Sequence, residues 1–358
     1  MLHDLRLRDF RCYEALRCDL GGQGAIFVGE NAQGKTSILE AVCVLLRLGS
    51  PRASSAAEMA RFGTRGFAIA GCVGGGDRCD LRHEVAGGKR TLSLNGETQE
   101  RAADYLAESG LVVWMGNEDL DLVRGSGSVR RRYLDFAASQ LMPGYRLALR
   151  SYERALRARN QLLKAPRPDE AQIAAYTKLL AEHGGELQRG RADLVAKLSP
   201  WASDAQRAVS GHRSEDLALR YKPSGAPDLA AAFAESLPSD LRRGQTQIGP
   251  HRDDAALDLN AMPAAQFASE GQQRTIALAL KLAQARLLES ERRQAPILLL
   301  DDIFGELDPG RRNALLGYLP DASQKLITTT HLGWLDGTGS VGSARQFSVH
   351  EGAVSSLG

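Results

Sequence analysis

The stretch Gly29-Glu30-Asn31-Ala32-Gln33-Gly34-Lys35-Thr36 decides the fold class of this chain of 358 residues. It matches the pattern G-x-x-x-x-G-K-[ST]. The apolar run 25–28 before it favours a buried strand, and the apolar residues 37–48 after it favour a helix that ends at Gly49. In this order of strand, turn and helix, backbone amides and the helix N-terminus bind phosphate groups.

The end of this stretch has chemical roles of its own. Lys35 can reach the β- and γ-phosphates of a nucleotide, and the Thr36 hydroxyl can bind Mg²⁺. We therefore predict that residues 29–37, ending at Ser37, bind ATP together with Mg²⁺. Asn31 and Gln33 can also be plain turn residues.

A second acidic motif lies far along the chain. The apolar run 297–300 favours a buried strand, and Asp301 and Asp302 follow it. Asp301 is predicted to hold Mg²⁺ through its water shell, and Asp302 to polarise the attacking water. A strand that merely ends in a solvated acidic turn is the alternative. The phosphate loop elsewhere in the same chain favours the functional interpretation.

Two further candidates are ambiguous from the residues alone. Ser269 and Gln272 have the spacing of a capping box at the start of a helix, which we expect to include residues 275–288. They can be a cap only, or a phosphate-binding helix terminus that Gly271 leaves open to a ligand. His331 follows the strand candidate 325–330 and is either structural or a γ-phosphate contact.

Composition indicates a cytoplasmic globular protein with room for two domains. The chain has no apolar run of about 18 residues and no secretion signal at its start. Its five cysteines form no Cys-x-x-Cys pair, so neither a zinc site nor a disulfide framework is expected. We therefore expect a reducing compartment and no membrane.

The middle of the chain changes to helical character. A helical period from Tyr145 to Leu163 and a seven-residue repeat from Ile173 to Leu194 predict an antiparallel helical hairpin that Pro200 ends. Residues 121–170 contain 11 basic and 5 acidic side chains, although the formal net charge of the whole chain is only +2. A polyanion partner fits this segment. One stripe of the first helix is a candidate DNA contact and, alternatively, a solvated face, namely Arg146, Arg150, Arg154 and Arg157.

Together these motifs resemble the SMC-like branch of the ABC-type ATPases, and within it the RecF family. The resemblance runs almost end to end. It rests on Phe10–Tyr13, Gly29–Thr36, Leu39–Ala41, Ser50–Arg52, Asn117–Leu120, Arg130–Asp135, Arg157–Asn160, Gly249–Asp254, Ser269–Arg274 and Leu299–Asp308. It implies an α/β ATPase head formed by residues 1–120 and 246–358, with an inserted α-helical arm at 121–245.

The resemblance also implies roles for single residues. Ser269 and Gly271, with Gln272, resemble the signature motif that contacts the γ-phosphate bound to the opposite subunit. Asp301 resembles the Walker B metal ligand and Asp302 the catalytic carboxylate. The other implied roles are those of Arg11 near the α-phosphate or base, Arg52 at the γ-phosphate or at DNA, His331 as the switch histidine, residues 305–308 as the D-loop, and Glu118 near the Q-loop.

The function implied is that of an ATP-dependent DNA-repair protein. Such a protein dimerises on ATP, binds duplex DNA at gaps and helps RecR and RecO load RecA. Many cassette ATPases have Glu where this chain has Asp302, which is one methylene shorter, so slow hydrolysis is expected. The nucleotide-binding subunit of a transporter and another SMC-like chromosome ATPase are alternatives. A P-loop kinase is a third, although it would not need Ser269–Arg274.

Overall fold

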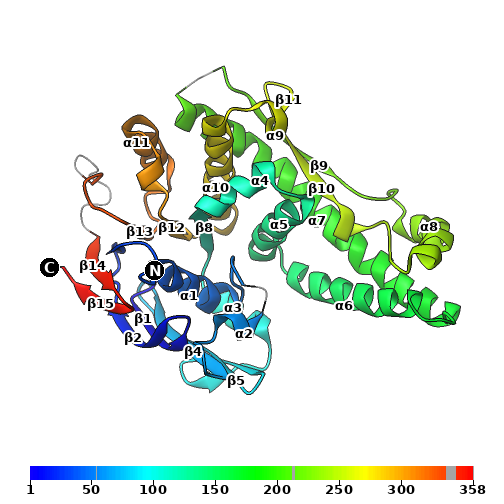
Figure 1. Cartoon of the computed structure of the whole chain (residues 1–358), viewed down its shortest axis with the longest axis horizontal. Coiled ribbons are helices and arrows are strands. Elements are labelled where there is room, and N and C mark those ends of the chain that lie inside the picture. Colours follow the sequence, from blue (N-terminus) through cyan, green and yellow to red (C-terminus); the bar gives the residue numbers. More distant parts are fainter. Residues whose placement is uncertain (54, 212–213, 336–343, 358) are drawn as a thin grey trace. The chain divides into compact units, whose positions relative to one another are not determined.

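The computed structural model describes residues 1–53, 55–211, 214–335 and 344–357 (Figure 1). The chain folds into two compact units. The first contains Met1–Glu118 and Leu288–Gly358, and the second contains Asp119–Leu287. The predicted division into head residues 1–120, arm residues 121–245 and head residues 246–358 remains a prediction, because the two units are defined by internal packing and not by function. Within the described ranges, no helix combines the length and the apolar character needed to cross a bilayer.

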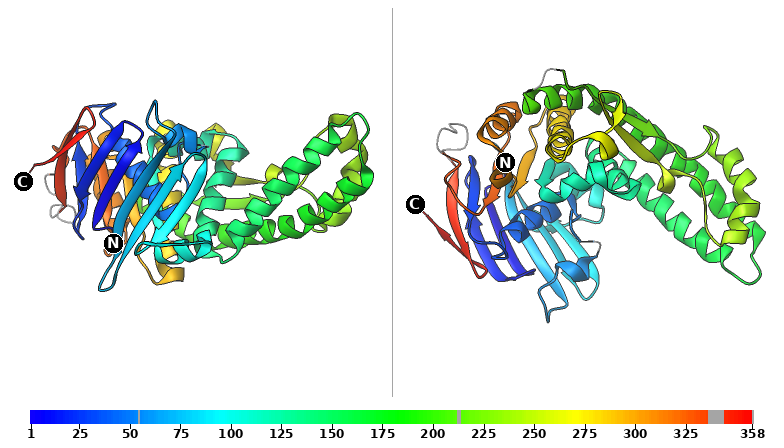
Figure 2. Two further views of the ribbon diagram at one scale, coloured as in Figure 1. Left: turned by 90° about the horizontal axis from the view of Figure 1, so that it is seen from below. Right: turned by 45° about the horizontal axis from the view of Figure 1, so that its top comes forward.

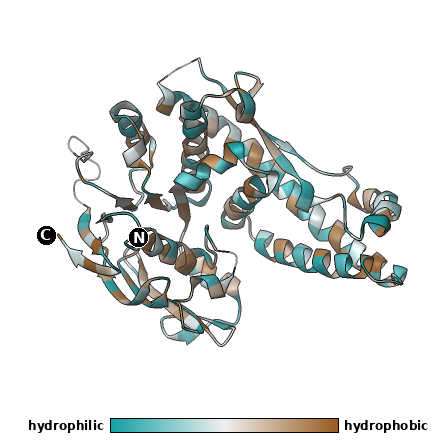
Figure 3. Cartoon of the chain, in the orientation of Figure 1, coloured by the Kyte–Doolittle hydropathy of each residue, from teal (hydrophilic) through white to brown (hydrophobic). Residues whose placement is uncertain are grey.

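The first unit contains a six-stranded sheet in the order β15-β14-β3-β13-β12-β8. All neighbouring strands in it are parallel except the hairpin of β14 and β15. Figure 3 shows β8 and β12 in hydrophobic colours, as expected for strands buried on both faces. The strands are β3 (Gly24–Val28), β8 (Val112–Gly116), β12 (Ile297–Asp301), β13 (Lys325–Thr329), β14 (Arg345–His350) and β15 (Ala353–Ser356).

A second, antiparallel sheet in the same unit has the order β2-β1-β4-β5-β6-β7 (Figure 2). Helix α1 (Lys35–Arg47) contacts strands of both sheets and is buried along most of its length. A helix that is apolar on nearly all of its faces must be surrounded by other apolar elements. The strands are β1 (Asp4–Phe10), β2 (Tyr13–Asp19), β4 (Gly66–Gly74), β5 (Arg78–Ala86), β6 (Lys89–Leu94) and β7 (Glu97–Thr98). The expected strand, turn and helix around the phosphate loop are confirmed.

Shorter helices complete the first unit, and they are α2 (Ala56–Met59), α3 (Ala102–Glu108) and α11 (Pro309–Tyr318). The second unit is mainly helical. It has a small sheet of β9 (Leu217–Lys222), β10 (Asp254–Leu259) and β11 (Met262–Pro263). Its helices are α4 (Asp121–Arg124), α5 (Gly127–Leu141), α6 (Tyr145–Leu163), α7 (Glu170–Ser210), α8 (Leu229–Arg243) and α9 (Ala264–Phe267). Helix α10 (Glu270–Arg292) begins in this unit, and the unit boundary falls within it.

Helices α6 and α7 form the predicted hairpin, but its second helix is longer than expected. The prediction that Pro200 ends this helix is wrong, because α7 continues through it to Ser210. A proline inside a helix costs about 3 kcal/mol. Beyond it, Ala202, Ala205 and Val209 are buried, and α7 packs against β9. Tertiary packing thus outweighs the local effect of the proline.

Buried ion pairs join the elements of the second unit. Arg191 bonds Asp135 with two nitrogens at 2.9 Å each, and its third contact is Asp253 at 2.9 Å. Arg159 has no exposed side-chain surface and pairs with the equally buried Asp240. Asp135, Arg159 and Asp253 lie in stretches that carry the family resemblance, so part of each of those stretches serves to hold the helical unit together.

Candidate functional site

The phosphate loop is held in a tight, left-handed path. Gly34 has φ +107°, and a Cβ there would lie 2.7 Å from the Tyr13 hydroxyl and 2.8 Å from Cys12 Sγ. A Cβ at Gly29 would lie 2.2 Å from the Val349 carbonyl oxygen of β14. Packing against neighbouring residues therefore requires glycine at both positions, whether or not a ligand also approaches the backbone there.

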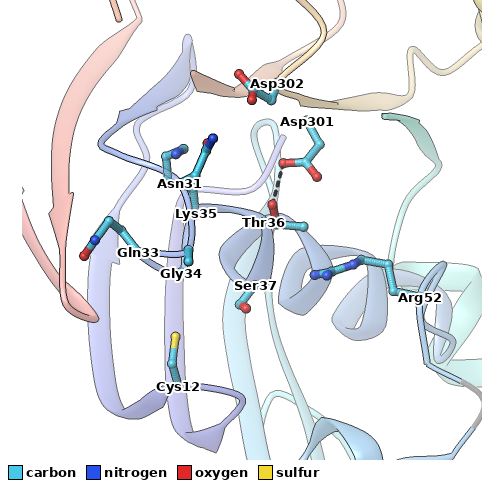
Figure 4. Close-up of a pocket in the computed structure, with 11 residues that line it drawn as sticks. Cys12, Asn31, Gln33, Gly34, Lys35, Thr36, Ser37, Arg52, Asp301 and Asp302 are labelled. Atoms are coloured by element: carbon cyan, nitrogen blue, oxygen red, sulfur yellow. Dashed lines mark hydrogen bonds between the residues drawn. The ribbon is translucent and has the colours of Figure 1, made fainter. Parts of the chain in front are cut away.

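A cavity of about 310 Å³ opens over the loop (Figure 4). The loop forms one side of it, and both carboxylates from the end of β12 lie on the other. The residues that line it are Cys12, Asn31, Ala32, Gln33, Gly34, Lys35, Thr36, Ser37, Arg52, Asp301 and Asp302. The structure thus brings together two motifs that are far apart in the sequence.

Lys35 lies at the first position of α1, and its ammonium group turns back onto the loop. Nζ donates to the carbonyl oxygens of Gly29 at 2.6 Å and Glu30 at 2.7 Å. Burial lowers the pKa of Lys35, and the nearby Asp302 and Asp301 oppose that shift. The ammonium is therefore a partly desolvated cation that a phosphate oxygen can engage strongly.

The Thr36 hydroxyl donates to Asp301 Oδ1 at 2.9 Å, and the Thr328 hydroxyl donates to the same oxygen at 2.7 Å. Burial raises the pKa of Asp301, while its bonds to Thr328 and Thr36 act in the opposite direction. A hydroxyl and a carboxylate in contact form an oxygen donor set of the type that Mg²⁺ prefers. The two predicted metal ligands therefore lie side by side.

Asp302 and His331 are placed differently at the strand ends. Asp302 lines the cavity with a left-handed backbone, φ 53°, and its N–H donates to the Thr328 hydroxyl at 3.0 Å. A non-glycine residue in this region stores strain, which is common at functional sites. His331 is exposed after β13 and is not one of the residues that line the cavity.

Two predicted nucleotide contacts have protein partners. The Arg11 guanidinium donates to both carboxylate oxygens of Glu40, at 2.8 and 2.6 Å, and Arg11 does not line the cavity. Gln33 accepts through Oε1 from the N–H of Glu351 at 2.5 Å, and Figure 4 shows its side chain directed away from Asp301. In this structure both side chains therefore organise the site, and their contact with a nucleotide stays a prediction.

The signature candidates lie in the second compact unit. Ser269 N–H donates to Gln272 Oε1 at 2.9 Å, and Gln272 N–H donates to Ser269 Oγ at 3.3 Å. This reciprocal pair confirms the capping box predicted at the start of α10. Ser269 is exposed, so the cap leaves one side of this helix terminus accessible to a ligand. Gly271 and Gln272 are half-buried in the first turn.

Comparison with known proteins decides the family. A family model described as an AAA domain matches residues 4–189. The DNA replication and repair protein RecF of Synechococcus sp. (strain JA-2-3B'a(2-13)) is 39% identical over 94% of this chain and 92% of that protein. The chain belongs to the RecF family.

Solved structures agree with this assignment. The recombination mediator protein RecF-ATP in the RecFOR pathway matches with a TM-score of 0.88 and 27% identity, over 100% of this chain and 97% of that one. An Smc head bound to the C-winged helix domain of ScpA matches with a TM-score of 0.55 at 15% identity, which shows the fold alone. The predicted fold class, an α/β ABC-type ATPase head with a helical insert, is confirmed.

The candidate DNA residues of this RecF-family chain fall in two places. Arg52 lines the cavity over the phosphate loop. The stripe of Arg146, Arg150, Arg154 and Arg157 lies on α6, where the last two are exposed and the first two half-buried. Among the described residues neither Arg154 nor Arg157 forms an ion pair within 4 Å, although the charge of Arg157 lowers the pKa of Glu153 against the larger effect of burial. Their role toward DNA stays a prediction.

The sequence predicted no role for Glu40 or Ser50, although both lie in stretches that carry the family resemblance. Glu40 is fully buried in α1 and joins Arg11 to the segment that contains Ser50 and Arg52. A signal was present, because one carboxylate in an otherwise apolar helix is costly to bury unless cations surround it.

We predict that Asp301→Asn raises the melting temperature of the nucleotide-free protein at neutral pH. Because burial raises the folded-state pKa of Asp301, its ionised form destabilises the fold, and stability falls as pH rises through that pKa. The asparagine is neutral and keeps an oxygen that can accept from Thr36. Thermal melts between pH 3 and pH 8 should show this gain disappearing below roughly pH 4, where the unfolded-state carboxyl is also protonated. A lower melting temperature than wild type at pH 7 contradicts the prediction.

Proposed function

We propose that this protein is an ATP-dependent, DNA-binding recombination mediator that hydrolyses ATP slowly. The observation that supports it most is the contact between the Thr36 hydroxyl and Asp301, 2.9 Å across 265 residues of sequence, beneath a phosphate loop. That contact joins the metal-side residues of the two nucleotide motifs. Membership of the RecF family supports the assignment to DNA repair.

The residues around the cavity fit ATP with Mg²⁺. Phosphate oxygens can replace the Gly29 and Glu30 carbonyls as acceptors for Lys35 Nζ. Thr36 and Asp301 supply oxygen ligands for the cation, whose chemistry is to neutralise charge that develops on the phosphates. Asp302 is the candidate to orient and polarise the attacking water, and His331 is a candidate γ-phosphate contact that must approach from outside the cavity.

The site is proposed to be completed by a second copy of the chain. Ser269 is exposed and Gly271 half-buried at the start of α10, and an anion is favoured at such a helix N-terminus. In the proposed dimer, this terminus of one copy contacts the γ-phosphate held by the loop of the other. ATP then stabilises the dimer because it contacts both copies, and hydrolysis releases them.

The DNA function is proposed for the arm. The basic stripe on α6 would contact the phosphate backbone of duplex DNA near gaps, with affinity that falls as salt rises. DNA is proposed to stimulate the slow ATPase, and the partners are RecR and RecO, which act with RecA. A transporter subunit is the second candidate function, but no observation on this chain favours it.

Complementation between two inactive variants tests the shared site. Lys35→Met removes the loop cation and Ser269→Arg blocks the signature helix terminus. Light scattering should show wild type dimerising only with ATP–Mg²⁺ and each variant remaining monomeric. An equal mixture should recover dimers and about one half of wild-type hydrolysis, since all of these dimers are mixed and each has one intact site of two.

The control is Ala234→Arg on the exposed face of α8, which changes the charge equally without touching either motif. It should dimerise like wild type. If wild type binds ATP but stays monomeric, the shared site is wrong while ATP binding stands. If the mixture stays inactive although wild type dimerises, the loop and signature act within one chain.

A further inference from the structure

A buried carboxylate organises one wall of the nucleotide cavity. Glu40 lies in α1, one turn beyond the phosphate loop, and its side chain has no exposed surface. Its oxygens accept from Arg11 at 2.6 and 2.8 Å and from the Ser50 hydroxyl at 2.5 Å, and Arg52 NH1 lies 3.9 Å away. A buried carboxylate with this many donors is held in position, because moving away from any donor would leave its charge less well compensated in the interior.

Ser50 links the position of Glu40 to the backbone of the next turn through hydrogen bonds. While its hydroxyl donates to Glu40, its oxygen accepts from the N–H groups of Arg52 at 2.9 Å and Ala53 at 2.8 Å. One hydroxyl therefore ties the backbone of this turn to the helix that begins in the phosphate loop. Arg11 secures the other side, since it also donates to the Glu58 carbonyl at 2.6 Å.

The result of this arrangement is an arginine at the metal side of the cavity. The Arg52 side chain is 45% exposed and lines the cavity together with Thr36 and Asp301. It lowers the pKa of Asp301 against the larger effect of burial, so its charge is felt at the metal-binding carboxylate. The terminal phosphates of a bound nucleotide would lie next to Lys35 and the metal ion. A fixed cation there favours the more highly charged triphosphate.

We infer that Glu40 and Ser50 are positioning residues that hold Arg52 toward the terminal phosphate and so make the site prefer ATP to ADP. The inference rests on the proposed nucleotide function and extends it to ligand preference. Glu40 and Ser50 do not line the cavity, so they act through Arg52. This role also gives Arg52 a nucleotide partner in place of DNA.

The test measures ATP and ADP affinities by calorimetry for wild type, Ser50→Ala, Arg52→Gln and the double variant. Arg52→Gln should reduce the ratio of ATP to ADP affinity about tenfold, the usual effect of losing a charged hydrogen bond. Ser50→Ala should reduce the ratio to a similar extent, and the double variant should be no worse than Arg52→Gln. Non-additivity of this kind identifies residues that act through one another.

Two further variants separate positioning from general damage. Ser50→Thr keeps a hydroxyl and should restore the wild-type ratio. Ser55→Ala, which removes an exposed hydroxyl bonded to Glu58, should leave the ratio unchanged. A Ser50→Ala ratio within twofold of wild type overturns the inference, and so does a double variant that adds both losses. If wild type binds neither nucleotide, the proposed function itself fails, and the inference fails with it.

Discussion

Lys35→Met should weaken ATP binding by roughly 30- to 150-fold while the nucleotide-free protein stays folded. The lysine is a partly desolvated cation whose Nζ already lies 2.6 and 2.7 Å from two loop carbonyls. Charge-assisted hydrogen bonds contribute about 1.5–3 kcal/mol, and the loss of about 2–3 kcal/mol corresponds to this change in affinity. Methionine retains most of the apolar stem, so packing around the loop is largely preserved.

Titration calorimetry with ATP–Mg²⁺ measures the loss, and a thermal melt without nucleotide serves as the check on folding. Lys89→Met at the exposed start of β6 is the matched control and should bind ATP as wild type does. Lys35→Met with an affinity within threefold of wild type would show that the loop does not hold phosphate groups. A fall in melting temperature of more than about 5 °C would point instead to a role in stability.

How much of the structure can be predicted from the sequence depends on how many residues separate the interacting side chains along the chain. The strand–loop–helix around Gly34 and the strand before Asp301 were predictable, because each is a continuous apolar segment with a local turn signal. The capping box of Ser269 and Gln272 was predictable for the same reason, since its two residues are only three positions apart. The loop and Asp301 were expected to act together, and they line one cavity. The role of Ser269 and Gln272 toward a nucleotide came from the family resemblance and stays a prediction.

The sequence does not reveal contacts that depend on long-range packing. Arg11 was predicted as a nucleotide contact, but its partner Glu40 is 29 residues away, and no local pattern joins the two. Pro200 was predicted to end α7, yet packing of the residues beyond it continues the helix. The pairs Arg159–Asp240 and Arg191–Asp253 span 81 and 62 residues, so no local pattern announces them.

The buried network around Arg191 leads to the largest stability effect that we expect. Its side chain is only 3% exposed, and it neutralises Asp135 on α5 and the fully buried Asp253 before β10. Arg191→Met removes the cation but leaves both carboxylates in the interior. Breaking a buried pair in this way costs about 3–5 kcal/mol, because the remaining charge has no partner.

For a unit of this size, such a loss lowers the melting temperature by roughly 6–20 °C, measurable by calorimetry or circular dichroism. Adding Asp253→Asn to Arg191→Met should recover part of the loss, because the neutral amide no longer needs the cation. Arg154→Met on the exposed face of α6 is the control and should stay within about 0.5 kcal/mol of wild type. If Arg191→Met melts within 2 °C of wild type, the network is dispensable, and the hydrogen bonds that Asp253 accepts from Gln188 and the Ser224 N–H must hold it without the arginine.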